Sequence, residues 1–187
     1  ASSERIFELL DTSVESAGGL AGEPPPSVGG TIEFRNVSFK YDPEATDYIL
    51  KDVSFSVEAG QSLAIVGATG SGKTTIVNLL CRFYDVQKGA VLVDGRDVRD
   101  WNVEDLRRRV SIVQQDVFLF SGTIGSNISL GNADISGPAL EQAAEHVNAD
   151  RFINRLPGRY GHEVAERGST LSAGERQLLS FARALAF

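Results

Sequence analysis

The sequence lacks methionine altogether and holds only one cysteine, one tryptophan and two histidines among 187 residues. With no methionine at position 1, we expect the chain to be a piece of a longer polypeptide. Cys81 has no partner for a disulfide within the chain, which fits a reducing compartment. No apolar run approaches the ~18–20 residues of a membrane-spanning helix, and no secretory signal opens the chain. We therefore expect a soluble piece without disulfides.

Basic residues are also few: 18 Lys and Arg stand against 25 Asp and Glu, a net charge of −7. A protein that binds the outside of a duplex usually carries a basic footprint, so this balance disfavours a nucleic-acid partner. The rest of the composition, 42% hydrophobic and 23% charged, is typical of a globular protein and excludes a disordered or collagen-like chain. A chain of this length can bury a substantial core.

Two regions differ in composition. Residues 3–10 have apolar side chains at helical spacing, and residues 17–30 are rich in glycine and proline. We interpret residues 1–30 as a linker with a short helix and residues 31–187 as the folded domain. Hydrophobic patterns within it predict strands at 32–41 (with a slip at 36–37), 53–57, 63–66, 90–93 and 110–113, and helices at 73–83, from 138 onward and at 172–187. The run at 63–66 is continuous, as in a fully buried central strand.

A phosphate-binding loop follows that run. Residues 67–74, Gly-Ala-Thr-Gly-Ser-Gly-Lys-Thr, match G-x-x-x-x-G-K-[ST], the Walker A pattern. Glycines let backbone amides turn toward a polyphosphate, and the helix that follows directs its positive end at the same anion. We expect Lys73 to reach the β- and γ-phosphates, Thr74 to hold Mg²⁺ and Thr75 to touch the α-phosphate. The residues predicted to bind the nucleotide here are Gly67, Thr69, Gly70, Ser71, Gly72, Lys73, Thr74 and Thr75.

A second motif indicates the family. Residues 171–175, Leu-Ser-Ala-Gly-Glu, resemble the LSGGQ signature of ATP-binding cassette (ABC) ATPases, with Ala173 and Glu175 as departures. On its own the pentapeptide is equally well a capping box, Ser172 with Glu175 three residues on. Together with the phosphate loop about 100 residues upstream, it identifies the chain as a member of this family. We expect the charge of Glu175 to point away from a bound phosphate.

The resemblance implies further site residues. Tyr41 would stack on adenine, although an inward-facing aromatic at a strand end is the alternative. Gln115 would contact Mg²⁺ and the attacking water, although a Gln-Gln pair is ordinarily a solvated turn. Ser172 and Gly174 would bind the ATP of a second domain. Residues 5–11, 118–128 and 163–168 are similar to exporter segments: the tail after the last membrane helix, and two segments that face the transmembrane domain.

One family motif is not among the 187 residues: four apolar residues followed by Asp and Glu, after the signature. Residues 90–94 imitate it, but Asp94-Gly95 is a hairpin-turn dipeptide. His146 and His162 precede the signature, so neither matches the switch histidine of the family. We therefore expect an incomplete sheet core, nucleotide binding, and little or no hydrolysis by this chain.

The resemblance implies an α/β fold: a P-loop NTPase-like mixed sheet core, an antiparallel β region near the N-terminus and a helical subdomain at about 116–180. It implies an ABC exporter ATPase that binds ATP and Mg²⁺ at the cytoplasmic face of the cell membrane. Its partners would be a transmembrane domain of the same polypeptide and a second nucleotide-binding domain, identical or different. Two alternatives stay open, a soluble ABC ATPase acting on nucleic acid and a non-catalytic ATP-binding module.

Overall fold

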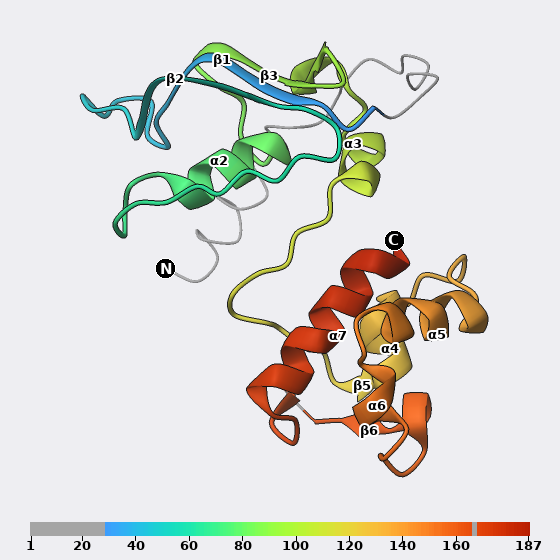
Figure 1. Cartoon of the computed structure of the whole chain (residues 1–187). Helices are drawn as coiled ribbons and strands as arrows, with labels where there is room; N and C mark the ends of the chain where they lie inside the picture. The colour runs from blue at the N-terminus through green and yellow to red at the C-terminus, as the bar shows by residue number, and fades with distance from the viewer. Residues whose placement is uncertain (1–28, 166–167) are drawn as a thin grey trace, which may run out of the picture. The chain divides into compact units, whose positions relative to one another are not determined.

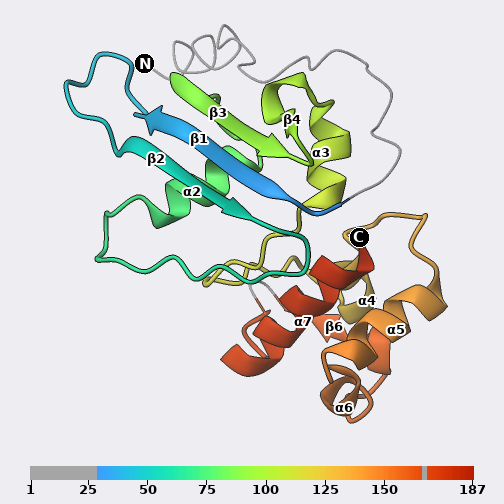
Figure 2. The same cartoon turned by 45° about the horizontal axis from the view of Figure 1, so that its top comes forward.

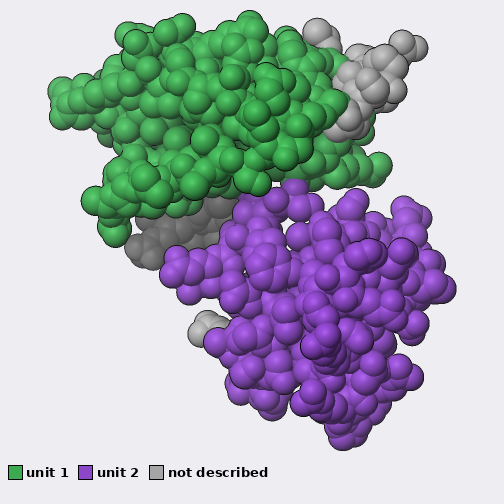
Figure 3. All heavy atoms as spheres, viewed as in Figure 1, with its two compact units in different colours: residues 1–110 green, residues 111–187 purple. Residues whose placement is uncertain are grey.

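The computed structural model describes residues 29–165 and 168–187, which form two compact units divided between Val110 and Ser111 (Figures 1 and 3). The predicted helix at 3–10, most of the predicted linker and two residues of the exporter-like segment 163–168 lie outside the described residues. Within the described residues, no helix is both long enough and apolar enough to cross a membrane.

The first unit is built on a four-stranded antiparallel sheet in the order β2-β1-β3-β4 (Figure 2). β1 (Ile32–Phe39) lies between β2 (Leu50–Val57) and β3 (Lys88–Val93), and β4 (Arg96–Asp97) pairs with β3. In β2 half-buried Val53, Phe55 and Val57 alternate with exposed residues, as predicted. This sheet is the antiparallel β region expected from the sequence.

The slip predicted in the first strand is a β-bulge. The register of β1 against β2 shifts between Phe34 and Val37, and Asn36 has a positive φ of 48°. The extra residue brings both Phe34 and Val37 into the core, where they are 1% and 0% exposed. Phe34 stacks on Phe55 across the strand pair, with ring centroids 4.6 Å apart.

Helices cover one face of this sheet. α2 (Lys73–Leu80) begins at the predicted residue and buries Leu79 among the sheet residues (Figures 1 and 2). η1 (Val98–Asp100) and α3 (Val103–Arg109) follow β4 and bury Val98 and Leu106 in the same core. The only tryptophan of the chain, Trp101, is 1% exposed in this core.

The predicted turn at Asp94-Gly95 is confirmed. It joins β3 to β4, with Val93 paired to Arg96 and positive φ angles of 52° at Asp94 and 76° at Gly95. Two successive positive φ angles are those of a type I′ hairpin turn. Asp94 also accepts hydrogen bonds from the backbone N–H and hydroxyl of Thr31. Asp94 is thus a turn residue, as the sequence indicated.

The second unit is mainly helical. It contains α4 (Ile124–Ser129), α5 (Gly137–His146), α6 (Asp150–Ile153), η2 (Arg159–Gly161) and α7 (Ala173–Ala186), with a small pair of strands, β5 (Gly122–Thr123) and β6 (Glu163–Val164). α7 packs against α4 and α5, burying Leu179 and Ala182 completely. The helices predicted from residue 138 and from residue 172 are confirmed, the second starting at Ser172 as its N-cap.

Two predicted strands are wrong. Residues 63–66 and 110–113 carry no strand assignment, and the side chains of Leu63, Ile65 and Val66 are 50%, 38% and 88% exposed. A buried parallel strand needs hydrogen-bonded neighbours and cover on both faces. Among the described residues every strand pairing is antiparallel and involves neither segment. The α/β class with an antiparallel region nevertheless holds.

Candidate functional site

Two glycines shape the phosphate-binding loop. Gly70 and Gly72 have φ angles of 85° and 88°, in the left-handed region that favours glycine. A Cβ on Gly72 would lie 2.7 Å from Cδ2 of Leu50, a buried side chain of β2. The Ser71 N–H donates to the Ala68 carbonyl oxygen at 3.2 Å and so closes a turn within the phosphate-binding loop. The backbone conformation at position 72 therefore favours glycine, and a Cβ there would force the Leu50 side chain to shift.

The start of α2 is open to an anion. Gly72 is its N-cap and supplies no side-chain cap, and the first bonded amide is that of Ile76, which donates to the Gly72 carbonyl at 3.1 Å. No acidic residue lies in the first turn. The preceding amides of the turn and the positive end of the helix dipole therefore provide the donor geometry that a phosphate needs.

Lys73 folds over the loop. Its Nζ donates to the carbonyl oxygens of Gly67 and Ala68, each at 2.8 Å. The ammonium group thus lies at the rim of the same loop whose amides precede α2. This is the arrangement expected of a lysine that contacts the outer phosphates of a bound triphosphate.

The two threonines differ in environment. Thr74 is exposed, whereas Thr75 is 5% exposed and its Oγ1 accepts a hydrogen bond from the Tyr41 hydroxyl. Among the described residues there is no group of three or more His, Cys, Asp or Glu side chains that could hold a metal ion. Mg²⁺ characteristically uses few protein ligands together with substrate phosphates, so an exposed hydroxyl beside a phosphate loop fits this ion.

Tyr41 lies just beyond β1 and is 42% exposed, so it is not the inward-facing aromatic of the alternative interpretation. Its ring makes edge contacts with Phe39 and Tyr84, at centroid distances of 4.9 and 4.8 Å. It also lines a surface cavity of about 190 Å³. A partly exposed aromatic ring held by other rings can offer area to a nucleobase.

In the second unit the signature residues form the N-terminus of α7. Ser172 is the N-cap, and its Oγ accepts the Glu175 N–H at 3.2 Å. Gly174 is exposed, and a Cβ there would meet nothing within 4 Å. Arg176 fixes the loop that leads into the helix, because its Nη1 donates to the Leu171 carbonyl at 2.7 Å.

The Glu175 side chain turns back to the start of the helix, where it forms the capping box that the sequence indicated. Its direction relative to a bound phosphate stays a prediction. Its Oε2 accepts both the Ser172 N–H and the Ser172 hydroxyl, each at 2.8 Å. The reason is the capping box itself: an acid at the third helical position reaches back to the N-cap amide. The carboxylate therefore bonds the very hydroxyl that was expected to meet a phosphate.

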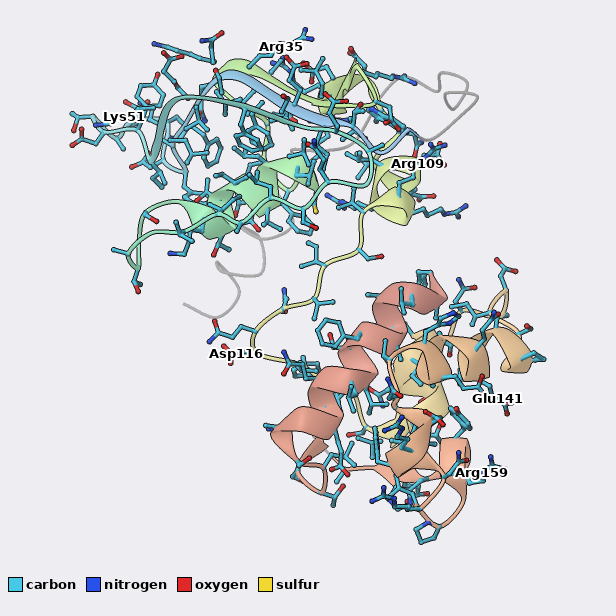
Figure 4. The ribbon with its side chains drawn as sticks, in the orientation of Figure 1. Arg35, Lys51, Arg109, Asp116, Glu141 and Arg159 are labelled. Atoms are coloured by element: carbon cyan, nitrogen blue, oxygen red, sulfur yellow. The ribbon has the colours of Figure 1, made fainter. Side chains whose placement is uncertain are left out.

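Gln115 lies on an exposed loop of the same unit, next to exposed Gln114 (Figure 4 labels the neighbouring Asp116). The segment that follows is tied to α7. Arg183 donates to the carbonyl oxygens of Phe118 and Asn127, and burial lowers the pKa of its guanidinium. Asn127, 1% exposed, in turn bonds both backbone groups of Phe120.

Comparisons with known proteins agree with these motifs. The ABC transporter family model matches residues 50–187. The chain belongs to the ABC transporter family. It is 48% identical, over its whole length, to the probable multidrug resistance ABC transporter ATP-binding/permease protein YheH of Bacillus subtilis, and covers 27% of that protein. It is 42% identical over 98% of its length to the fatty acid ABC transporter ATP-binding/permease protein of Mycobacterium bovis, covering 28%.

A solved structure shows the same ABC fold. A bacterial Atm1-family ABC exporter with ATP bound superimposes with a TM-score of 0.87 at 41% identity, over 98% of this chain and 32% of that one. The chain thus spans about a third or less of the length of the relatives it matches. The fold class predicted from the sequence, that of an ABC ATPase, is confirmed.

Within the first unit of this ABC domain, the structure brings Tyr41 to the phosphate-loop helix through Thr75. Gln115, Ser172 and Gly174 belong to the second unit, and each of them is exposed there. The sequence motifs gave no indication of Asn78 and Gln87, two polar side chains that hold Tyr41 and the backbone before it. They belong to no recognised pattern and are found only through their hydrogen bonds.

Proposed function

We propose that this chain is the ATP-binding domain of an ABC exporter and binds Mg-ATP at its phosphate loop. The observation that carries the proposal is the start of α2: two left-handed glycines, an uncapped helix N-terminus and Lys73 folded over the loop. These features bind a polyphosphate through backbone amides, a helix dipole and one cation.

Each predicted residue then has a defined contact. Lys73 contacts the β- and γ-phosphates, Thr74 ligates Mg²⁺, and Thr75 reaches the α-phosphate. The role of Gln115 at the metal stays a prediction from the sequence. The other loop residues, Gly67, Thr69, Gly70, Ser71 and Gly72, contribute backbone amides and turn geometry. Tyr41 stacks on adenine.

A second nucleotide-binding domain completes the site. Its Ser172 and Gly174 direct the N-terminus of α7 at the γ-phosphate, so two domains enclose two ATP molecules. The pair lies at the cytoplasmic face of a membrane. Its closure and opening move a transmembrane domain of the same polypeptide, and this movement exports a substrate. Nothing about the chain, with its net charge of −7, favours nucleic acid as a partner.

Hydrolysis needs more than these residues supply. Phosphoryl transfer depends on a second carboxylate for the metal and a group that orients water. The 187 residues contain no Asp-Glu pair after an apolar run, so we expect this chain to bind ATP with little or no turnover. A steady ATPase rate that Lys73→Ala abolishes would contradict this expectation.

The test is ATP binding by calorimetry, with and without Mg²⁺. Lys73→Ala should weaken binding at least about tenfold, because charge-assisted hydrogen bonds contribute about 1.5–3 kcal/mol. Lys51→Ala is the control, since it removes an equal charge from an exposed side chain of β2 (labelled in Figure 4). Equal ATP affinity for wild type and Lys73→Ala would overturn the proposal.

A further inference from the structure

The hydroxyl of Tyr41 is held from two sides by α2. It donates to Oγ1 of Thr75 at 3.2 Å and accepts from Nδ2 of Asn78, also at 3.2 Å. Thr75 and Asn78 are three residues apart on α2, so they share one face of the helix. A ring that only stacked on a base would need neither of these bonds.

The backbone before Tyr41 is fixed as well. The Gln87 side chain accepts the Lys40 N–H at 3.0 Å and donates to the Lys40 carbonyl at 2.9 Å. This pair of hydrogen bonds fixes the backbone of Lys40, the residue between β1 and Tyr41. With Phe39 and Tyr84 against the ring edges, both ends of the tyrosine are restrained.

These contacts link the ring proposed to stack on the base to the helix that follows the phosphate loop. α2 begins at Lys73 in the phosphate loop, and the Asn78–Tyr41–Thr75 bonds tie the ring to that helix. A side chain that is ordered before a ligand arrives loses less conformational freedom when the ligand binds. The ring is therefore placed at a set distance from the phosphate loop in advance.

We propose that Asn78 is a positioning residue for nucleotide binding: through the Tyr41 hydroxyl it fixes the base-stacking ring relative to the phosphate loop. The inference rests on the proposed function, because it takes Tyr41 as the platform for the base. The inference gives a role to the Tyr41 hydroxyl, which stacking does not use, and to Asn78, which belongs to no motif.

The experiment compares two ligands, ATP and inorganic tripolyphosphate, titrated calorimetrically into the full 187-residue chain. Tripolyphosphate occupies the phosphate loop but has no base, so it does not sense the ring. The variants are Asn78→Ala, which removes the bond between Asn78 and Tyr41, and Tyr41→Phe, which removes that bond and the bond to Thr75. Val77→Ala is the control, a partly exposed neighbour on the same helix.

We expect Asn78→Ala to weaken ATP binding about fivefold, as for the loss of one hydrogen bond, and Tyr41→Phe to weaken it at least as much, because it removes two. Both variants should weaken tripolyphosphate binding less than twofold. The double variant should weaken ATP binding about as much as Tyr41→Phe alone, because Tyr41→Phe already removes the bond to Asn78. Val77→Ala should change neither affinity.

Equal losses for the two ligands would show a merely structural role for Asn78 and overturn the inference, as would unchanged ATP affinity in both variants. Lys73→Ala separates this failure from that of the proposed function. If Lys73→Ala abolishes ATP binding while Asn78→Ala leaves the ratio of the two affinities unchanged, only the positioning role falls. If Lys73→Ala has no effect, the phosphate site itself is wrong.

Discussion

Replacing Gly72 by alanine should destabilise the first unit much more than the same change at Gly70. Both residues have nearly the same backbone, with φ angles of 88° and 85°, so the left-handed conformation costs alanine about 1–2 kcal/mol at either position. Alanine also lowers the conformational entropy of the unfolded chain, which offsets about 0.4–1 kcal/mol of this cost at each position. The conformational cost therefore cancels in the comparison.

The difference between the two positions is space. A Cβ at Gly70 would meet nothing within 4 Å, whereas at Gly72 it would lie 2.7 Å from Leu50 Cδ2. Leu50 is 4% exposed in the sheet core, so it cannot swing into solvent. Overpacking of this kind costs about 1–3 kcal/mol. We expect a loss of about 1 kcal/mol for Gly70→Ala and about 2–4 kcal/mol for Gly72→Ala.

The assay is urea unfolding followed by tryptophan fluorescence, because the only tryptophan, Trp101, is buried in the first unit and reports on that unit. In a Leu50→Val background, which lacks the colliding methyl group, Gly72→Ala should cost about 1–2 kcal/mol less than in wild type. Equal destabilisation by the two alanine variants, or no relief by Leu50→Val, would refute the steric argument.

Three further outcomes are expected in the wild-type background. Glu175→Gln should keep the capping box while Ser172→Ala should lose it, at a cost of about 1 kcal/mol measured by helical circular dichroism; equal stability of the two variants would contradict the assigned bonds. Arg183→Met should destabilise the second unit by about 1–3 kcal/mol, since it removes the hydrogen bonds that a charged donor makes to the carbonyl oxygens of Asn127 and Phe118, and Arg183→Lys should recover part of the loss in the same melt. Burial alone would raise the pKa of Asp97, but hydrogen bonds and charge from Arg99 outweigh burial and lower it. The stabilisation by the Asp97 carboxylate is thus complete above the unfolded pKa of about 4 and is lost as the pH falls through the lower folded pKa. In urea titrations from pH 6 to pH 2, the free energy of unfolding should therefore fall less steeply for Asp97→Asn than for wild type.

Much of this architecture could be predicted because the signals are local. The phosphate loop, the start of α2 and the N-cap of α7 each depend on a few adjacent residues whose backbone requirements are strong. The bulge at Asn36 was readable because it shifts the alternation of β1 by one residue. Local rules are sufficient where a residue's neighbours in sequence are also its partners.

The rest depends on partners distant in sequence. The apolar run at 63–66 has the composition of a central strand, but a strand exists only where another strand pairs with it. The helix predicted to reach residue 83 ends at Leu80, where Arg82, with a φ of 51°, takes the left-handed position usual for glycine. Arg82 also reaches Asp85 and the Trp101 carbonyl, and no local pattern reveals those contacts.

The site divides in the same way. Lys73 and the glycines follow from a motif, whereas Asn78 and Gln87 act through hydrogen bonds to residues 37 and 47 positions away. Glu175 belongs with the predictable residues, because its capping-box partner Ser172 lies only three positions away. The hydrogen bonds that its carboxylate makes to Ser172 determined its direction.

The two bonds from Lys73 to the carbonyl oxygens of Gly67 and Ala68 make phosphate binding an exchange reaction. An ammonium group has three N–H donors, so one remains for a phosphate oxygen, and each further contact to a phosphate must replace a bond to Gly67 or Ala68. A single phosphate group presents its oxygens at one place, whereas a triphosphate can meet the lysine and the loop amides together. Under the proposed function, we therefore expect a single inorganic phosphate to compete poorly with a triphosphate for this loop.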